Sequence, residues 1–390
     1  MAGNPFIWGQ TIDDGIKRNQ FCTEIAIDLK GQMNKSMFGI RGTGKSSFLQ
    51  YELAEELHKK EPGMPKWDML YVDLGKVINN SSFVTALVSA MKKVKSDSLR
   101  RRAVIRLSEL ELSFNVNFGV GEIGVKKVPD APANLDNPEL LRETLSSIRE
   151  LCPHLVVAFD EFQALYEYPE NPLPMIRSTL LSGGEGEIAL LISGSIKRKI
   201  QMMKKKNMDA LWDDLDDVSF PNLSADKLIS HIEDKFNNSG REITPQGAEY
   251  IVQISAGHPK TTQRISSYIW KSAQGIKLID KTYVSQAYIE HMTDTEALQD
   301  YVMLMNGLKE GSKAEQAEWK ALYMIASGGL TSNDVDYRKY GFNSRQTSQQ
   351  AADRLENKGL IYNTSRVSKR YQVQDPLFAA YLRSTNPVII

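Results

Sequence analysis

Apolar residues in the first part of the chain gather in short continuous runs, separated by stretches in which they recur at helical spacing. Continuous apolar runs occupy 155–161 and 188–195, and shorter β-compatible runs occupy 35–40, 67–73 and 217–220. Residues 46–57, which follow the run 35–40 after a short glycine-rich stretch, carry apolar side chains at the spacing of a helix. Uninterrupted apolar strands are typical of a parallel sheet that helices cover on both faces. The pattern therefore predicts an α/β fold with a parallel sheet flanked by helices.

From about residue 315 the pattern changes to short helices followed by a hairpin. Residues 318–326 form an apolar helical stretch, Thr331 begins a second short helix, and a third runs from Asn343 to Asn357. The runs 360–363 and 370–373 then read as two strands. Three helices and a hairpin predict a winged helix-turn-helix.

A basic segment lies between the second and third predicted strands. Residues 92–106 carry seven Lys or Arg, and Asp97 is the only acid among them. Such a segment is either a solvated helix face or a contact for nucleic acid. Residues 112–121 then alternate like a strand and include two glycines, so we expect a hairpin there.

Composition limits the classes of protein that fit this pattern. At about 150 residues per domain, a chain of 390 residues predicts two or three domains. Lys and Arg balance Asp and Glu at 48 each, so the net charge favours neither nucleic acid nor a membrane as partner. Two cysteines are too few for a disulfide framework, and no apolar run approaches the roughly 18 to 20 residues of a membrane span. We expect a cytoplasmic protein without a membrane partner.

A phosphate-binding motif lies between the first predicted strand and its helix. Residues 39–46 read Gly-Ile-Arg-Gly-Thr-Gly-Lys-Ser and fit the pattern G-x-x-x-x-G-K-[ST]. The three glycines allow a tight turn that points backbone N–H groups at phosphate oxygens. Lys45 is expected to reach the β- and γ-phosphates, and Ser46 to offer its hydroxyl to Mg²⁺. The motif predicts a site for ATP or GTP.

Two carboxylates end the apolar run that begins at residue 155. Ligands of parallel sheets bind at the carboxyl ends of strands, so Asp160 is expected to hold Mg²⁺ and Glu161 to deprotonate the attacking water. Ser193 or Ser195 would sense the γ-phosphate, unless the pair is an ordinary turn. Because the run 67–73 lies between the two motifs, we expect at least one strand to separate them. These features predict a Mg²⁺-dependent ATPase.

With these residues placed, the chain resembles the archaeal-type ATPase family of the STAND and AAA-like P-loop proteins. The resemblance rests on Asn4-Pro-Phe-Ile-Trp-Gly9, Arg41, Asp160-Glu-Phe-Gln163, Ser193-Gly-Ser195, Ala256-Gly-His-Pro-Lys260 and Asp375-Pro-Leu-Phe378. It implies a helical lid with a Gly-x-Pro motif that closes over the nucleotide, and Lys260 close to the phosphates or the adenine. The implied domains are an ATPase core at 1–222 with a basic insertion at about 92–135, a lid at 223–305 and a winged helix at 306–390.

The motifs and the resemblance together assign residues to the ATP and Mg²⁺ site. The residues expected to contact the nucleotide are Gly39, Arg41, Gly42, Thr43, Gly44, Lys45, Ser46, Ser47, Gly257 and Pro259. The catalytic residues are expected to be Lys45, Asp160, Glu161 and Ser193, and the ligands of the metal Ser46 and Asp160.

The chain departs from the family near residues 211–218, where an arginine is often found and this sequence has only acids. Arg198 is the nearest candidate for an arginine finger. A neighbouring subunit could supply one instead, which makes a homo-oligomer possible.

The predicted winged helix offers polar and basic residues to a partner. In a helix-turn-helix, the recognition helix meets base edges and the wing touches phosphates. The candidates are Arg345, Gln346 and Gln349 in the helix, and Arg366, Lys369 and Arg370 in the wing. The partner would be double-stranded DNA, or else a protein, because the fold alone does not determine the partner.

We therefore expect a molecular switch that binds and hydrolyses ATP and couples its nucleotide state to the winged helix. Two alternatives remain open. One is a regulatory ATPase of low turnover whose winged helix binds a protein. The other is a DNA-loading ATPase that oligomerises on DNA.

Overall fold

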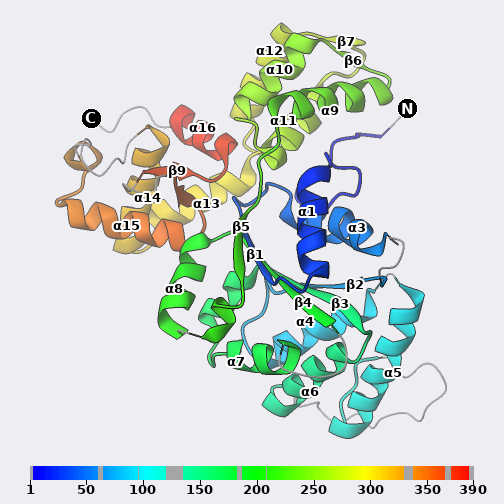
Figure 1. Ribbon diagram of the computed structural model, residues 1–390. Helices are drawn as coiled ribbons and strands as arrows, with labels where there is room; N and C mark the ends of the chain where they lie inside the picture. Colours follow the sequence, from blue (N-terminus) through cyan, green and yellow to red (C-terminus); the bar gives the residue numbers. More distant parts are fainter. Residues whose placement is uncertain are drawn as a thin grey trace. The chain divides into compact units, whose positions relative to one another are not determined.

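The computed structural model describes residues 3–59, 65–94, 96–119, 135–181, 187–207, 209–328, 337–364 and 370–385. The chain folds into two compact units (Figure 1). Lys17–Gly39 and Lys45–Pro221 form the first, which we call the sheet unit. Met1–Ile16, Ile40–Gly44 and Asn222–Ile390 form the second, which we call the helical unit.

Five parallel strands form the sheet of the first unit. They are β1 (Lys35–Phe38), β2 (Asp68–Asp73), β3 (His154–Asp160), β4 (Glu187–Gly194) and β5 (Asp216–Ser219). Their order across the sheet is β2-β3-β4-β1-β5, and every neighbouring pair is parallel. The predicted parallel sheet is confirmed.

The strand that separates the two nucleotide motifs is β4, which lies between β1 and β3. We expected the run 67–73 to separate the motifs because it lies between them in the sequence. It instead forms β2 at the edge of the sheet. Burial explains the difference. Every residue of β4 after Glu187 is buried, as a central strand requires, whereas buried and less buried residues alternate along β2.

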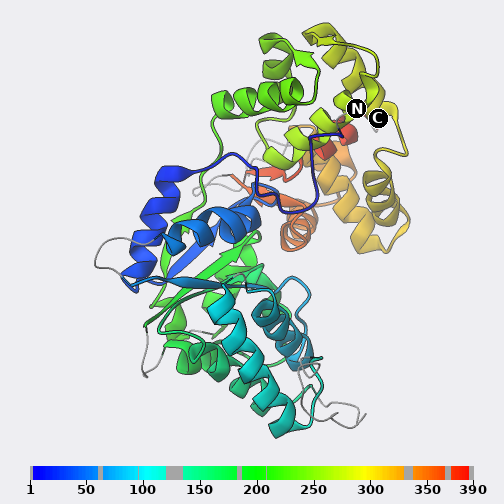
Figure 2. The ribbon, with the colours of Figure 1, turned by 90° about the vertical axis from the view of Figure 1, so that its right-hand side faces the viewer.

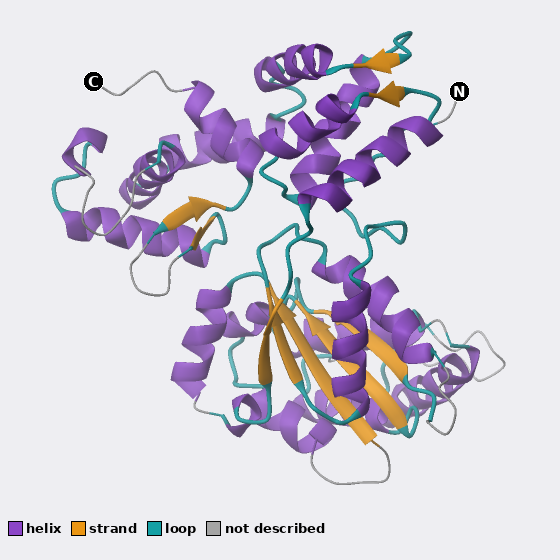
Figure 3. Ribbon diagram, turned by 45° about the horizontal axis from the view of Figure 1, so that its top comes forward, coloured by secondary structure: helices purple, strands orange, loops and turns teal. Residues whose placement is uncertain are grey.

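Helices cover both faces of the sheet (Figure 3). On one face, α1 (Asn19–Lys30) and the helical stretch of α2 (Lys45–Ser47), a π segment (Phe48–Leu53) and α3 (Ala54–His58) pack on Val156 and Ala158 of β3. On the other face, α4 (Asn80–Lys92), α5 (Asp97–Phe114) and α6 (Pro138–Arg149) pack against one another and share a core with Val157 and Phe159 (Figure 2). Successive β3 residues thus face opposite cores. The unit also contains 3₁₀ turns at Phe162–Glu167 and Ala210–Trp212, α7 (Leu173–Ile176), a π segment (Arg177–Leu181) and α8 (Lys197–Asn207).

The expected strand at 112–121 is wrong for its first residues, because α5 continues to Phe114. Leu99, Ala103, Leu107 and Leu110 recur at helical spacing and are buried, so the helical period governs this stretch. Asn115 ends the helix in a left-handed conformation with φ 51°. Residues 120–134, which include the rest of the expected hairpin, lie outside the described part of the chain.

The helical unit begins with four helices and two short strands. These are α9 (Ala225–Asn238), β6 (Glu242–Ile243), α10 (Pro245–Ile254), α11 (Pro259–Ser272), β7 (Leu278–Ile279) and α12 (Lys281–Thr293). The N-caps of the four helices are Ser224, Thr244, His258 and Asp280, and each side chain accepts a backbone N–H of the first turn. The caps explain why each helix begins where it does.

The last part of the unit contains the predicted third helix and hairpin. Its elements are α13 (Gln299–Glu310), α14 (Lys313–Ala326), a 3₁₀ turn (Tyr337–Tyr340), α15 (Arg345–Asn357), β8 (Ile361–Asn363), β9 (Tyr371–Val373) and α16 (Pro376–Thr385). Strands β8 and β9 are antiparallel. The helix expected at 318–326 begins earlier, because Ser312 and Glu315 form a capping box. Of the expected second helix, residues 331–336 lie outside the described residues.

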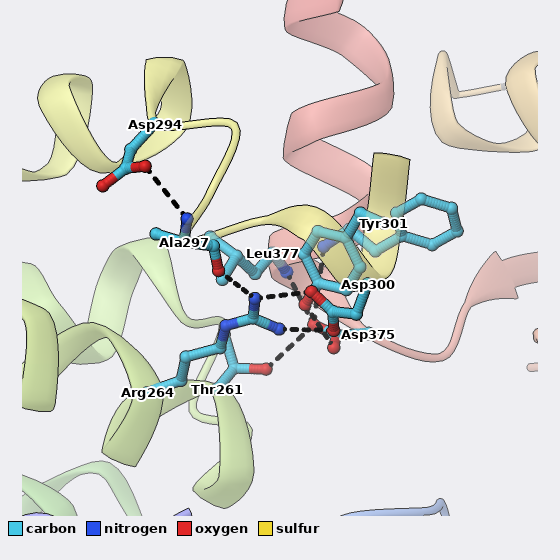
Figure 4. A network of polar contacts seen from close by, with 9 residues as sticks. Thr261, Arg264, Asp294, Ala297, Asp300, Tyr301, Asp375 and Leu377 are labelled. Atoms are coloured by element: carbon cyan, nitrogen blue, oxygen red, sulfur yellow. Dashed lines mark hydrogen bonds and ion pairs between the residues drawn. The ribbon is translucent and has the colours of Figure 1, made fainter. Parts of the chain in front are cut away.

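Polar contacts around Arg264 join several segments of this unit (Figure 4). The Arg264 guanidinium donates to both oxygens of Asp300 at 2.8 and 2.9 Å and to the Ala297 carbonyl at 2.7 Å. The guanidinium carbon lies 4.7 Å from the ring centroid of Trp8 and 4.5 Å from that of Tyr301. The N-terminal segment is therefore attached to α11 and α13.

Among the residues that the structure describes, none of the helices combines the length and the apolar character that a membrane crossing requires.

Candidate nucleotide site

The phosphate loop directly follows β1 and leads into the helical stretch that begins at Lys45. Gly42 and Gly44 have φ of 81° and 96°, a backbone conformation that favours glycine. The Lys45 ammonium donates to the Gly39 carbonyl at 2.8 Å, so the side chain folds back across the start of the loop. The Thr43 hydroxyl donates to the Ile40 carbonyl at 2.7 Å. The loop has the turn that its glycines predicted.

Two hydroxyl groups converge on the buried carboxylate of Asp160 at the end of β3. Ser46 Oγ donates to Asp160 Oδ2 at 2.5 Å, and Tyr71 Oη donates to the same oxygen at 2.9 Å. Asp160 is 2% exposed. Burial, with a further contribution from Asp160, raises the pKa of the Tyr71 hydroxyl, so this group remains a donor. A hydroxyl and a carboxylate oxygen side by side are ligands that Mg²⁺ accepts, so these residues fit the metal.

Glu161 lies next to Asp160 in a left-handed conformation with φ 53°. Its Oε2 accepts the Ser195 hydroxyl at 2.9 Å and the side-chain amide of Gln163. The Ser195 backbone N–H donates to Gln163 Oε1 at 3.2 Å. The two carboxylates are therefore held by different partners, Asp160 by Ser46 and Tyr71, and Glu161 by Ser195 and Gln163.

The two serines at the end of β4 differ in their surroundings. Ser193 is fully buried, and its hydroxyl has no hydrogen-bond partner among the described residues. Ser195, two residues further on, reaches Glu161. Of the pair in the sequence motif, Ser195 is thus the one brought to the acidic residues, and a role for Ser193 stays a prediction.

Within the helical unit, loop residues 40–44 contact the start of α11. His258 Nε2 donates to the Arg41 carbonyl at 2.8 Å, and the Lys260 backbone N–H donates to the Gly42 carbonyl at 3.2 Å. Gly257, with φ 65°, makes the turn before α11, and Pro259 begins the helix. That Gly257 and Pro259 lie near the nucleotide stays a prediction of the resemblance, and the contact from the central His258 to the loop was not foreseen.

A cavity of about 1260 Å³ lies in the same unit beside these residues. Its lining includes Ile40 and Thr43 of the loop, Gly257 and Pro259. Tyrosines from α10, α12, β8 and β9 also line it, namely Tyr250, Tyr288, Tyr362 and Tyr371. Ile40, Thr43 and the Gly-x-Pro turn therefore border an open space that is wide enough for a ligand.

The nucleic-acid candidates differ in their exposure. Arg345, Gln346 and Arg370 are exposed. Gln349 is partly buried and donates to Asp353 at 2.9 Å and to the Tyr371 hydroxyl at 3.0 Å. Arg366 and Lys369 lie outside the described residues, and so does the side chain of Arg198, the arginine-finger candidate.

The basic segment 92–106 forms the end of α4 and much of α5. Arg102 donates to the Leu151 carbonyl at 2.9 Å, and Arg106 pairs with Glu109 and Glu150. Arg100 and Arg101 are exposed. At least two of the basic side chains therefore have structural partners, and a nucleic-acid contact there stays a hypothesis.

Comparison with known proteins identifies the fold. No family model and no curated protein matches the chain. The chain is similar to the solved structure of a Walker-type ATPase of Pyrococcus abyssi, with 16% identity over 96% of this chain and 97% of that one and a TM-score of 0.63. It is also similar to the ORC2 protein of Aeropyrum pernix in ADPNP–ADP complexes, with 15% identity over 98% and 97% of the two chains and a TM-score of 0.57. The fold is that of P-loop ATPases.

Proposed function

We propose that the protein binds ATP with Mg²⁺ and hydrolyses it to ADP and inorganic phosphate. The observation that supports this most is the arrangement at the end of β3. Ser46 of the phosphate-loop helix and Tyr71 both donate to the buried Asp160, and Glu161 lies beside it. This combination suits phosphoryl transfer, in which positioning and charge supply most of the catalysis.

Each residue has a chemical role in this proposal. Lys45 exchanges the Gly39 carbonyl for oxygens of the β- and γ-phosphates, and the loop N–H groups bind the same phosphates. Ser46 and Asp160 would hold Mg²⁺, which would supply positive charge to neutralise the phosphates. Glu161 accepts a proton from water, whose oxygen attacks the γ-phosphorus while the bond to the leaving ADP oxygen breaks. The other loop residues, 41–44 and 47, contact the nucleotide.

The helical unit is proposed to couple the nucleotide to the C-terminal elements. His258 and Lys260 contact loop carbonyls, and Gly257 and Pro259 border the same cavity. The Thr261 hydroxyl donates to Asp375 Oδ1 at 3.1 Å and the Tyr301 hydroxyl to Asp375 Oδ2 at 2.6 Å (Figure 4). Asp375 precedes α16, so a shift of α11 reaches the last helix through one carboxylate.

We assign residues 306–390 to a winged helix that binds double-stranded DNA. Arg345, Gln346 and Arg370 support this partner because they are exposed. Gln349 supports the alternative of a protein partner, because its amide is already bonded to Asp353 and Tyr371.

ATP hydrolysis by the purified protein, with and without Mg²⁺, tests the first proposal. Hydrolysis that requires Mg²⁺ supports it, and no hydrolysis with Mg²⁺ contradicts it.

Titration with duplex DNA at several salt concentrations tests the proposal that residues 306–390 bind DNA. Arg345→Ala is expected to weaken binding and to reduce its dependence on salt. Lys313→Ala, which removes an exposed cation of α14, serves as the matched control. Hydrolysis without any DNA binding would favour the protein partner.

A further inference from the structure

Gln163 contacts both Glu161 and Ser195, although neither motif assigned it a role. It lies in the 3₁₀ turn Phe162–Glu167, directly after the two acidic residues, and is 6% exposed. Its Nε2 donates to Glu161 Oε2 and lies 3.2 Å from Ser195 Oγ, while its Oε1 accepts the Ser195 backbone N–H at 3.2 Å. The side chain thus links the turn after β3 to the end of β4.

The partners determine which way the amide of Gln163 points. The Ser195 N–H can only donate, so it must face the amide oxygen, and the Glu161 carboxylate accepts, so it must face the amide nitrogen. The reverse orientation would place two acceptors together. An amide of this length satisfies both partners, whereas a glutamate would keep the contact with the Ser195 N–H and lose the donor to Glu161.

The backbone of Glu161 gives a reason for this support. The residue departs from the strand with φ 53° and ψ 38°, a conformation that non-glycine residues rarely adopt, so β3 alone does not fix its carboxylate. The contacts from Gln163 and Ser195 both engage Oε2. This arrangement assigns the second oxygen, Oε1, to the proton of the attacking water.

Gly194, at the end of β4, leaves room for the side-chain amide of Gln163. A Cβ added at Gly194 would lie 2.6 Å from Gln163 Oε1, which is closer than such atoms approach each other. A larger residue at position 194 would therefore displace the amide oxygen. The amide position that Gly194 leaves free is the one in which Gln163 Oε1 accepts the Ser195 N–H.

We propose that Gln163 is a positioning residue that holds the Glu161 carboxylate for the attack of water on ATP. The inference rests on the proposed function, because it requires Glu161 to act as the base. It adds a residue whose effect is on the chemical step and not on the binding of the nucleotide.

The test compares Gln163→Glu with the wild type in steady-state hydrolysis and in equilibrium binding of ATP. Gln163→Glu keeps the size and the acceptor toward Ser195, but it replaces the donor with an acceptor and adds a negative charge beside Glu161. We expect kcat to fall roughly 10- to 100-fold, because a displaced catalytic group has an effect of that size, and the ATP dissociation constant to stay within about twofold. Gln163→Met provides a second, uncharged variant. Gln263→Met, a partly buried glutamine bonded to His231 in the other unit, is the matched control and should keep kcat.

The outcomes separate the inference from the function on which it rests. No hydrolysis by the wild type overturns the proposed function. Hydrolysis by the wild type with kcat within about twofold in both folded Gln163 variants overturns the inference alone. A fall in kcat that is matched by an equal loss of ATP affinity or by unfolding also overturns it, because the role would then be structural. A fall in kcat with intact binding and fold supports it.

Discussion

Acidification is expected to destabilise the helical unit through His291. This residue of α12 is 3% exposed, and its ring lies against that of Tyr268 with centroids 4.2 Å apart and the planes tilted by 33°. Neither ring nitrogen has a hydrogen-bond partner among the residues that the structure describes. Burial, together with the nearby charge of Arg264, lowers the pKa of His291 to about 4, and the carboxylates of Asp294 and Asp300 oppose this only in part.

The sign and the size of the effect follow from this pKa. Between pH 6.5 and 4 the unfolded chain binds a proton at His291 that the folded unit does not bind, so acid favours unfolding. The stabilisation is complete above pH 6.5 and is lost as the pH falls toward 4. The difference from the ordinary value of 6.5 corresponds to about 3 kcal/mol in full, and to about 2 kcal/mol at pH 5.

The assay is urea unfolding at pH 7.5 and 5.0, read by pulsed hydrogen exchange of peptides from α11 and α12. Other groups titrate in the same range, since the pKa of His231 is also lowered, chiefly by burial. His291→Phe therefore provides the reference. It keeps an aromatic ring against Tyr268, and its free energy of unfolding should fall about 2 kcal/mol less than that of the wild type between the two pH values. An equal fall in both proteins would refute the reasoning.

Three further predictions concern single contacts. Gly42→Ala should weaken ATP binding about tenfold or more, because φ is 81° and the new Cβ would meet His258 Cε1 at 2.7 Å; calorimetric titration measures this, and His258→Ala should restore part of the affinity. Lys35→Met should cost the sheet unit about 1–2 kcal/mol in urea melts, since Lys35 is buried but its carboxylate partner Asp28 is partly exposed and its partner Asp216 is exposed. Burial lowers the pKa of Lys35, but the hydrogen bonds to those carboxylates outweigh it and raise the pKa, so the wild-type advantage should persist until above pH 10.5. Tyr301→Phe removes the 2.6 Å hydrogen bond to Asp375. On ATP binding, α16 should therefore gain less protection from hydrogen exchange in this variant than in the wild type.

The sequence was sufficient to predict the parallel sheet and the phosphate loop, because both depend on local patterns. The apolar and β-compatible runs became the strands, and the glycines at 42 and 44 adopt positive φ as the motif required. The order of the strands was not predictable in this way. Strand β4 lies between β1 and β3 through a crossover connection, which the order along the chain does not specify.

The residues that sequence analysis missed at the candidate site share one property. Each of them contacts a residue that is distant in the sequence. Tyr71 reaches Asp160 from the neighbouring strand, and His258 reaches the Arg41 carbonyl from the start of α11. Gln163 lay within a quoted motif, but its contact with Ser195 depends on the pairing of β3 with β4. At residues 112–114, the alternation of polar and apolar residues predicted a strand wrongly. The helical spacing of the preceding residues already continues through this stretch.

The measurement that tests the central claim most directly is ATP binding and hydrolysis by the wild type, Lys45→Ala and Glu161→Gln in the presence of Mg²⁺. The account predicts that Glu161→Gln binds ATP like the wild type and hydrolyses it about 100-fold or more slowly, because it keeps the phosphate loop and loses the base. Lys45→Ala is expected to lose binding. Hydrolysis at the wild-type rate by Glu161→Gln would contradict the account and remove Glu161 from the mechanism.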